Sequence, residues 1–454
     1  MGPRGLWHTG RVEELRDLAT RSRHAVVLAA AVGIATGVIV AGFDEVVVRM
    51  QGWVGHRNVV VIALAPTMGL AVAAIALWIG RTGPATSDDY IRSFHRFDEL
   101  PATAAVHPSL SARTALARLV GAIASLGTSG AMGLEGPSVY FGSTIGANVQ
   151  HRLRRLTRGA EPGLLLAAGA AAGVAAIFKA PATGAIFAIE VPFQDDLARR
   201  MLLPALVASG TGYLAFAAFH GTSPVLEIGG APGFTAKDLA AAVLLGVVAG
   251  IGARVFARFV RWAKHAGTLG SPAARVAIAG AALAVLSLLG EALTGAALTG
   301  EAPRDHGVVL SSGYSLIGWA LDEHRAIWLL LVILVLRCGA TGAMMAGGAV
   351  GGVFIPLVVA GALVGRVVGE IADPGQRSLF LVVGVAAFLG AGYRVPLAAV
   401  MFVAETTGRP SFVVPGLLAA VAAELMMARS SVSAHQVWPE QPHRRVNRQG
   451  EPSG

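Results

Sequence analysis

The chain contains long stretches without a single formally charged side chain. Residues 25–43, 59–80 and 201–219 hold no Asp, Glu, Lys or Arg. Each stretch is close to the roughly 20 residues that an α-helix needs to cross the hydrocarbon core of a bilayer. A helix also satisfies its own backbone hydrogen bonds, which a bilayer cannot do for it. The sequence therefore predicts an all-α protein that spans a membrane several times.

Other apolar stretches are shorter and contain glycine, for example residues 239–253, 276–290 and 379–393. Broken backbone at membrane depth is tolerated where it lines a cavity. We therefore expect partial, tilted or broken helices beside the simple spans. The composition agrees, because 54% of the 454 residues are hydrophobic and only 14% are charged, against about 25% in a soluble domain.

The net charge of +9 does not indicate a nucleic-acid partner. Basic residues gather near the termini and in loops such as "HRLRRLTR" at 151–158, without interleaved aromatic residues that would stack on bases. By the positive-inside rule, we expect a cell-membrane protein with both termini in the cytoplasm. Cys338 is the only cysteine, which excludes an intramolecular disulfide and a multi-cysteine metal site. We expect neither metal nor cofactor.

Two pairs of segments repeat each other. "GAAAGVAAIFKAPATGAIFAIE" and "GVAAFLGAGYRVPLAAVMFVAE" each place a glycine twelve residues before a proline and a glutamate nine residues after it. These prolines, Pro181 and Pro396, lie 215 positions apart (396 − 181). "GPSVYFGSTIG" and "IPLVVAGALVG" share P-x4-G-x3-G, and Pro137 and Pro356 lie 219 positions apart (356 − 137). Two motifs with nearly equal displacements indicate an internal duplication.

The duplication predicts the organisation of the chain. We expect a cytoplasmic segment at 1–23, a membrane repeat at 24–220, a linker at 221–236, a second repeat at 237–428 and a cytoplasmic tail at 429–454. Repeats with interrupted helices are typical of transporters, in which half-helix ends meet near the membrane midplane. The glycines of the repeated motif also allow helices to pack closely.

Two glycine-rich stretches, "GLEGPS" at 133–138 and "GGVFIP" at 351–356, occupy matching places in the repeats. Each contains a proline suited to the first turn of a helix. A helix N-terminus presents unpaired N–H groups and a positive partial charge, which together bind anions. Glycine lets the backbone approach a ligand closely. Two such termini that meet would hold an anion without a full positive charge and would still release it.

Glu135 is the one acid within these stretches. Its carboxylate is itself an anion and can compete for the same N–H groups, whereas the protonated side chain loses that attraction and can swing away. An ionisable residue within the membrane is a functional candidate by default, although a glutamate here could simply cap the helix that starts near Pro137. We interpret Glu135 as a gate and as a candidate proton carrier.

The motifs resemble those of the CLC chloride channels and proton/chloride antiporters. The resemblance rests on "GLEGP", "GGVFIP" and "RVPLAAVMFVAETTG" and covers almost the whole chain. It implies an all-helical fold of two inverted repeats, without CBS domains, and a homodimer with one anion pore per subunit. It also implies that Glu135 is the external gating glutamate and that backbone N–H groups line the anion sites. These groups belong to Leu134, Gly136, Val353, Phe354 and Ile355.

The chain departs from the family pattern around the expected pore. The first anion motif of the family, GSGIP, corresponds to "ATSDDYI", which makes Thr86 or Ser87 the candidate pore hydroxyl. We interpret the following Asp88 and Asp89 as a solvated helix start. The inner pore tyrosine of the family corresponds to Val432, which predicts a wider or less polar inner gate.

A further departure concerns the internal proton acceptor. Antiporters of the family commonly carry two adjacent glutamates, and "AIEVPF" offers Glu190 followed by the apolar Val191. This departure favours a channel, although water or another acid could relay protons. We interpret Glu190 and its repeat mate Glu405 as structural residues that brace the same element in each half.

The favoured function is transport of chloride, and of other small anions, through a CLC-type pore, with proton-coupled antiport as the alternative. A fluoride exporter fits the first two motifs less well, and a cation-coupled transporter would need more acids at membrane depth than the sequence offers. An intramembrane enzyme would need a catalytic pair, and no Ser/His pair or zinc-ligand spacing is visible, so we expect no enzyme. A membrane-anchored scaffold would leave the repeat unexplained.

Overall fold

The structure, a computed structural model, describes residues 4–97, 108–157, 160–226, 228, 233–295, 308–322 and 325–438. Within these ranges the chain is helical, and its sixteen α-helices form two consecutive sets of eight. The first set comprises α1 (Arg4–Gly55), α2 (Val59–Gly80), α3 (Ser87–Arg96), α4 (Ala112–Gly127), α5 (Glu135–Arg152), α6 (Leu164–Phe178), α7 (Pro181–Glu190) and α8 (Leu202–His220). The second comprises α9 (Ala236–Ala266), α10 (Pro272–Thr294), α11 (Tyr314–Asp322), α12 (Ile327–Gly347), α13 (Phe354–Ala372), α14 (Arg377–Tyr393), α15 (Pro396–Thr407) and α16 (Val413–Met427). Short 3-10 helices lie at Pro108–Leu110, Arg199–Met201, Pro374–Gln376 and Pro410–Phe412.

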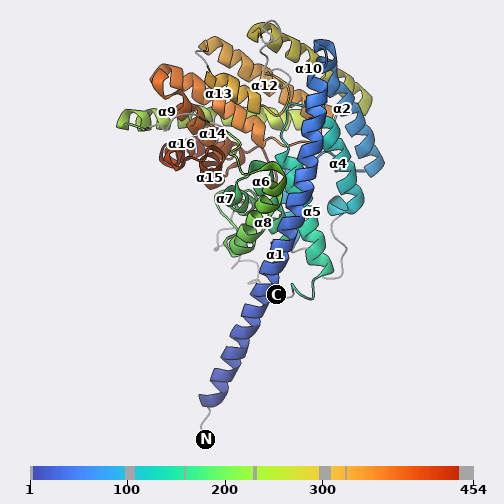
Figure 1. The fold of residues 1–454 in the computed structure, drawn as a ribbon, viewed down its shortest axis with the longest axis vertical. Coiled ribbons are helices and arrows are strands. Elements are labelled where there is room, and N and C mark those ends of the chain that lie inside the picture. The colour runs from blue at the N-terminus through green and yellow to red at the C-terminus, as the bar shows by residue number, and fades with distance from the viewer. Residues whose placement is uncertain are drawn as a thin grey trace, which may run out of the picture.

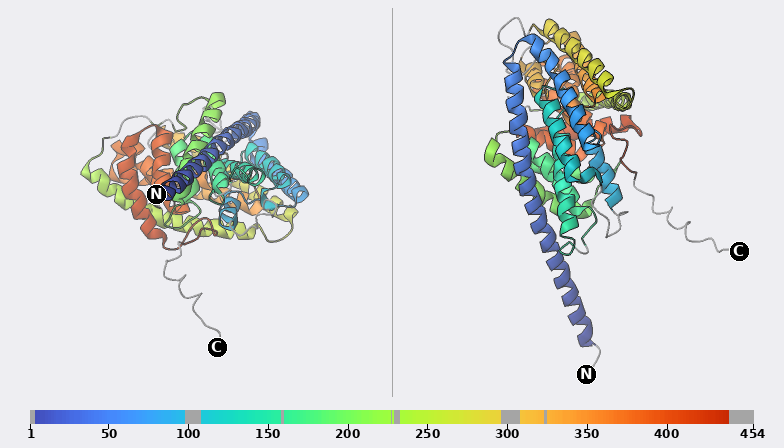
Figure 2. Two further views of the ribbon diagram at one scale, coloured as in Figure 1. Left: turned by 90° about the horizontal axis from the view of Figure 1, so that it is seen from below. Right: turned by 90° about the vertical axis from the view of Figure 1, so that its right-hand side faces the viewer.

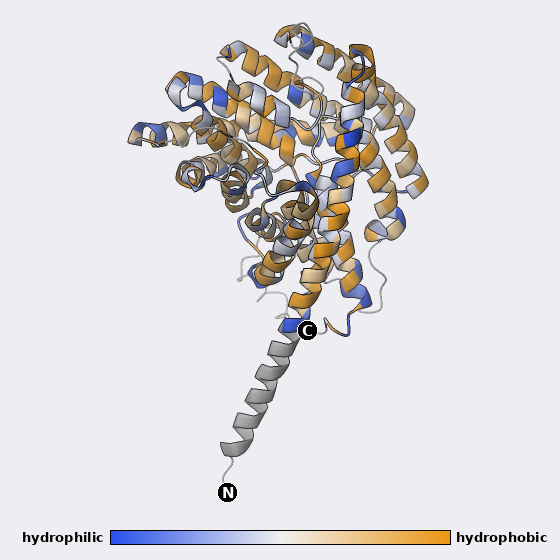
Figure 3. Ribbon diagram, in the orientation of Figure 1, coloured by the Kyte–Doolittle hydropathy of each residue, from blue (hydrophilic) through white to orange (hydrophobic). Residues whose placement is uncertain are grey.

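Nine helices in the described part of the chain are long and apolar enough to cross a membrane, and hydrophobic residues cover most of their length (Figure 3). Two stretches expected to form partial helices instead belong to long ones, since residues 239–253 lie within the 31-residue α9 and residues 276–290 within the 23-residue α10. Helix α9 continues through its charged residues because these find partners. Arg261 donates to the Ser431 carbonyl (2.6 Å), and Lys264 pairs with Asp88.

Equivalent helices pack in the same way in both halves. Helix α5 packs on α6 through glycines, since a Cβ at Gly142 would lie 2.0 Å from the Gly169 carbonyl oxygen. In the second half α13 packs on α14, and a Cβ at Gly361 would lie 2.5 Å from the Gly384 carbonyl oxygen. Larger side chains at these positions would force the helices apart. The repeated glycines therefore do pack helices closely, as the sequence predicts.

The two halves are inverted relative to each other, and two glutamates make this visible. Glu405, near the end of α15, accepts hydrogen bonds from two backbone N–H groups at the start of α7, at 2.9 and 2.7 Å. Glu190, at the end of α7, accepts two from the start of α15, at 3.1 and 2.9 Å. Each helix thus caps the start of the other, so the two run antiparallel. The structural interpretation of both glutamates is confirmed.

The halves occupy different sides of one bundle. Figures 1 and 2 show the blue-to-green helices of the first half beside the yellow-to-red helices of the second. Helix α8 ends at His220 and α9 begins at Ala236, so the chain passes from one half to the other between these residues. The equivalent helices α5 and α13 begin inside the bundle, at the buried residues Glu135 and Phe354, where the candidate site lies.

Candidate functional site

The starts of α5 and α13 meet at a short backbone pairing. The Gly133 N–H donates to the Gly352 carbonyl (3.0 Å), and the Gly352 N–H donates to the Gly133 carbonyl (2.8 Å), which forms one antiparallel bridge. Helix α5 begins two residues later at Glu135, and α13 begins at Phe354. The helices run apart from this bridge, so both present their positive N-terminal ends to the same place.

The Glu135 carboxylate fills the space between the two helix starts. Its side chain is buried (2% exposed), and Oε1 accepts a hydrogen bond from the Phe354 N–H at 2.7 Å. The Ile355 N–H also faces the carboxylate. Oε2 has no hydrogen-bond partner in the described part of the chain. A Cβ at Gly133 would lie 1.8 Å from Oε2 and a Cβ at Gly352 2.1 Å from Oε1, so a larger residue at either position would displace the carboxylate. A Cβ at Gly352 would also lie 2.6 Å from the Gly136 backbone nitrogen.

Glu135 lines one cavity, and its carboxylate rests against a glycine that lines a second. The first cavity, of about 250 Å³, is lined by Leu134, Glu135 and Ile355 together with the titratable groups of Asp44, Lys179, His220 and Tyr314. The second cavity, of about 360 Å³, reaches Gly352, against which the carboxylate rests. Its lining also includes Thr86, Ser87, Asp88, Arg92, Lys264, Val353, Tyr393, Val432 and His435. The first cavity thus reaches Glu135 directly, and the second reaches the glycine against which its carboxylate rests.

Nearly all of the predicted site residues lie around the starts of α5 and α13 and in the lining of the two cavities. Gly136 packs against the Thr86 hydroxyl, since a Cβ at Gly136 would lie 2.7 Å from that oxygen. Val191 stands apart from both cavities: it is buried, and its carbonyl accepts a hydrogen bond from the Gln436 side chain (2.9 Å). The position that the resemblance assigns to the internal proton acceptor is therefore packed with apolar and amide groups.

The two candidate pore hydroxyls differ in their contacts. The Thr86 hydroxyl donates to the Gly351 carbonyl (3.2 Å) and so ties the start of α3 to the loop before α13. The Ser87 side chain lies beside the Tyr393 hydroxyl, and both residues line the second cavity. Ser87 is thus the hydroxyl that is available to a ligand in that cavity.

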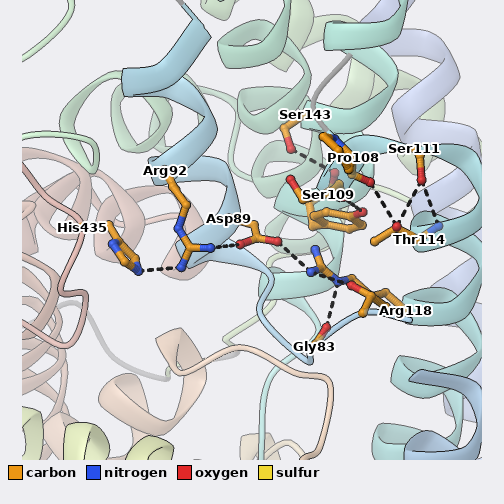
Figure 4. A network of polar contacts seen from close by, with 12 residues as sticks. Gly83, Asp89, Arg92, Pro108, Ser109, Ser111, Thr114, Arg118, Ser143 and His435 are labelled. Atoms are coloured by element: carbon orange, nitrogen blue, oxygen red, sulfur yellow. Dashed lines mark hydrogen bonds and ion pairs between the residues drawn. The ribbon is translucent and has the colours of Figure 1, made fainter. Parts of the chain in front are cut away.

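Asp89 corrects the expected solvated helix start. Its side chain is buried (3% exposed) and pairs with Arg118 of α4 at 2.6 Å and with Arg92 at 3.3 Å. Figure 4 shows this network, in which Arg92 reaches His435 and Arg118 reaches the Gly83 carbonyl. Two buried charges are tolerated because they are paired and hydrogen-bonded. The network fixes the start of α3, and with it the two pore-hydroxyl candidates.

Arg337 is a buried cation close to the loops that shape the site. Its guanidinium donates to four successive carbonyls of residues 309–312, at 2.6 to 2.8 Å. The Ser311 N–H in turn donates to the Ser129 carbonyl (2.7 Å), in the loop before α5. The charge therefore organises backbone and lines neither cavity. The groups that can attract an anion are therefore the starts of α5 and α13, the hydroxyls, and three cations that line the cavities, Lys179, Arg92 and Lys264.

Comparison with known proteins identifies the family. A sequence model of the family described as voltage gated chloride channel matches residues 98–428. The chain belongs to this family. It is 28% identical to a ClcB-like chloride channel protein of Ralstonia nicotianae, over 87% of this chain and 92% of that protein. It is 26% identical to the H(+)/Cl(-) exchange transporter ClcA of Yersinia pestis, over 94% of this chain and 90% of that protein.

The fold agrees with this assignment. The structure resembles that of a slow cyanobacterial Cl-/H+ antiporter, with a TM-score of 0.72 and 21% identity over 89% of this chain and 94% of that one. The protein is thus a multi-pass membrane protein of the CLC family. Sequence reasoning missed two features of its site, the buried Asp89–Arg118 pair and Tyr393. Tyr393 had one visible signal, since it aligns with Phe178 in the repeat.

Proposed function

We propose that this CLC-family protein exchanges chloride for protons across a membrane, with the Glu135 carboxylate as its gate. The supporting observation is the place of that carboxylate, which lines one cavity, rests against a glycine of the second and accepts the Phe354 N–H that an incoming anion would need. Two unit charges 4 Å apart at an effective dielectric constant of about 20 repel by about 4 kcal/mol. Chloride and ionised Glu135 therefore exclude each other, and protonation of Glu135 opens the path.

We propose exchange rather than the passive channel that the sequence favours. A relative aligned over 94% of the chain is named an H(+)/Cl(-) exchange transporter, and its length is covered almost completely. The lining of the first cavity supports proton access to Glu135, because two titratable side chains, Asp44 and His220, lie there together. The His220 Nε2 atom lies 3.3 Å from Asp44 Oδ2. Because Glu135 must take up a proton before an anion can enter, one side chain would couple proton movement to chloride movement.

A passive chloride channel is the second candidate. Two observations favour it: Val191 occupies the position of the internal proton acceptor, and it lines neither cavity. A relative aligned over 87% of the chain is named a chloride channel protein. In this case protonation of Glu135 would gate chloride flow without stoichiometric proton movement.

Purified protein in liposomes separates the two candidates. A chloride gradient is imposed, and chloride and proton movements are recorded together with two electrodes. Exchange predicts that the chloride gradient drives protons uphill, whereas a channel moves chloride alone. Replacing chloride with fluoride or nitrate in the same vesicles tests anion preference.

Glu135→Gln tests the gate itself. The amide cannot ionise, so chloride flux should persist, lose its acceleration by external acid and carry no protons. Glu161→Gln is the matched control, because Glu161 pairs with Arg200 near the surface and such pairs contribute little. Chloride flux in Glu135→Gln with the pH dependence of the parent protein would contradict the gate.

A further inference from the structure

Tyr393 is the last residue of α14 and presents a hydroxyl to the second cavity. The side chain is buried (3% exposed), and its hydroxyl lies against the Ser87 side chain and the Val353 N–H. By the family resemblance, the Val353 N–H is an expected anion ligand and Ser87 is one of the two candidate pore hydroxyls. Val432, the counterpart of the inner pore tyrosine of the family, lines the same cavity. A phenol therefore stands in the cavity although the residue expected to supply one is a valine.

The ring of Tyr393 is held on its apolar side. It packs against Phe187 and Phe354, with ring centroids 5.7 and 6.3 Å apart. Edge and tilted contacts of this kind stabilise aromatic packing and fix ring orientation. The hydroxyl is the only polar atom of the side chain, so this packing directs it toward Ser87 and the start of α13.

The internal repeat shows that the fold does not require this hydroxyl. Phe178 occupies the equivalent position in the first half, since each residue lies three before a repeat-related proline. Phe178 also packs on Phe354, with centroids 4.6 Å apart, and lines the first cavity. The two aromatic rings thus contact the same ring and face different cavities. A phenylalanine satisfies the packing in one half, so the oxygen of Tyr393 needs an explanation other than packing.

We propose that Tyr393 is an anion ligand in the second cavity and determines anion affinity there. The proposal rests on the proposed function, because it takes chloride as the transported anion. The Ser87 hydroxyl and the Val353 N–H face the phenol oxygen. An anion that enters takes both of these donors and receives the O–H of Tyr393 as a third. Three neutral donors hold a small monovalent anion and also permit its release.

Tyr393→Phe removes the hydroxyl and keeps the ring, as Phe178 does in the first half. Calorimetric titration of the detergent-solubilised full chain with chloride should show binding weakened roughly tenfold, because one hydrogen bond to a charged group is lost. Tyr90→Phe is the matched control. Tyr90 is equally buried, but its hydroxyl donates to the Ala188 carbonyl (2.6 Å) and lines neither cavity, so the chloride affinity should stay unchanged.

Val432→Tyr, added to Tyr393→Phe, provides a rescue that a merely structural role would not show. It returns a hydroxyl to the second cavity from the position used in the family, and chloride affinity should recover. Equal chloride affinity of Tyr393→Phe and the parent protein would overturn the proposal. Tighter chloride binding by Tyr393→Phe would also overturn it, because the hydroxyl would then obstruct the anion rather than bind it.

The titration distinguishes this proposal from the proposed function. A parent protein that binds no chloride would count against chloride transport itself. Chloride binding by the parent with no change in Tyr393→Phe would count against Tyr393 alone. Ser87→Ala supplies an independent measurement: if both hydroxyls hold one anion, the two substitutions should be non-additive in a double-mutant cycle.

Discussion

Replacing Glu405 or Glu190 with alanine should destabilise the junction between the two halves. Glu405 accepts three hydrogen bonds from the start of α7, from the N–H groups of Ala182 and Thr183 at 2.9 and 2.7 Å and from the Thr183 hydroxyl at 2.6 Å. Glu190 accepts two, from N–H groups at the start of α15. Each substitution therefore leaves two backbone N–H groups at a helix start without an acceptor.

The size of the effect follows from burial. A buried donor without a partner costs about 1–3 kcal/mol, so two such donors cost about 2–6 kcal/mol. Glu190 is 5% exposed, which leaves water little access, although a cavity of about 220 Å³ adjoins it. Glu405 is half-buried, so water can replace part of its three bonds. We expect both variants to lose about 2–4 kcal/mol, with Glu190→Ala at the upper end.

Thermal unfolding in detergent, followed by tryptophan fluorescence, measures the effect. Glu161→Ala is the control, because removal of a surface carboxylate should change stability by less than about 0.5 kcal/mol. Glu190→Gln should lie between alanine and the parent protein, since the amide oxygen can still accept from one of the two N–H groups. Unfolding of Glu190→Ala and Glu405→Ala at the temperature of the parent would refute the view that these carboxylates brace the inverted halves.

Other substitutions test the site and the assembly. Ser87→Ala should weaken chloride binding in a calorimetric titration more than Thr86→Ala, because the Thr86 hydroxyl already donates to a backbone carbonyl; equal effects would contradict this. Asp89→Asn leaves Arg118 buried without its counter-charge and should lower the free energy of unfolding by about 3–5 kcal/mol. A melting temperature equal to that of the parent protein would refute this. Val191→Glu should raise the number of protons moved per chloride in liposomes. An unchanged ratio would contradict the view that the lack of an acid at this position limits proton coupling. Light scattering should give twice the chain mass of 46.3 kDa, whereas a stable and active monomer would contradict the homodimer.

The sequence by itself determined the class of the protein, the duplication and the place of Glu135. These features are local: an uncharged run of about 20 residues predicts a span wherever it occurs, and glycine beside proline predicts a helix start. The two repeat displacements relate residues that lie far apart, but they require no knowledge of contacts. For the same reason the sequence does not predict the length of α9, since its charged residues find partners in other parts of the chain.

Only the tertiary structure decided which polar groups face the cavities. Asp89 looks like any acid at a helix start until Arg118 of α4 is brought within 2.6 Å of it. Tyr393 looks like one aromatic residue of an apolar helix until the inverted packing sets its hydroxyl against Ser87 and Val353. Such contacts join residues separated by tens to hundreds of positions, and their geometry depends on how the helices of both halves pack. A linear pattern records which groups are available, whereas packing determines which of them meet and which lose their contact with solvent.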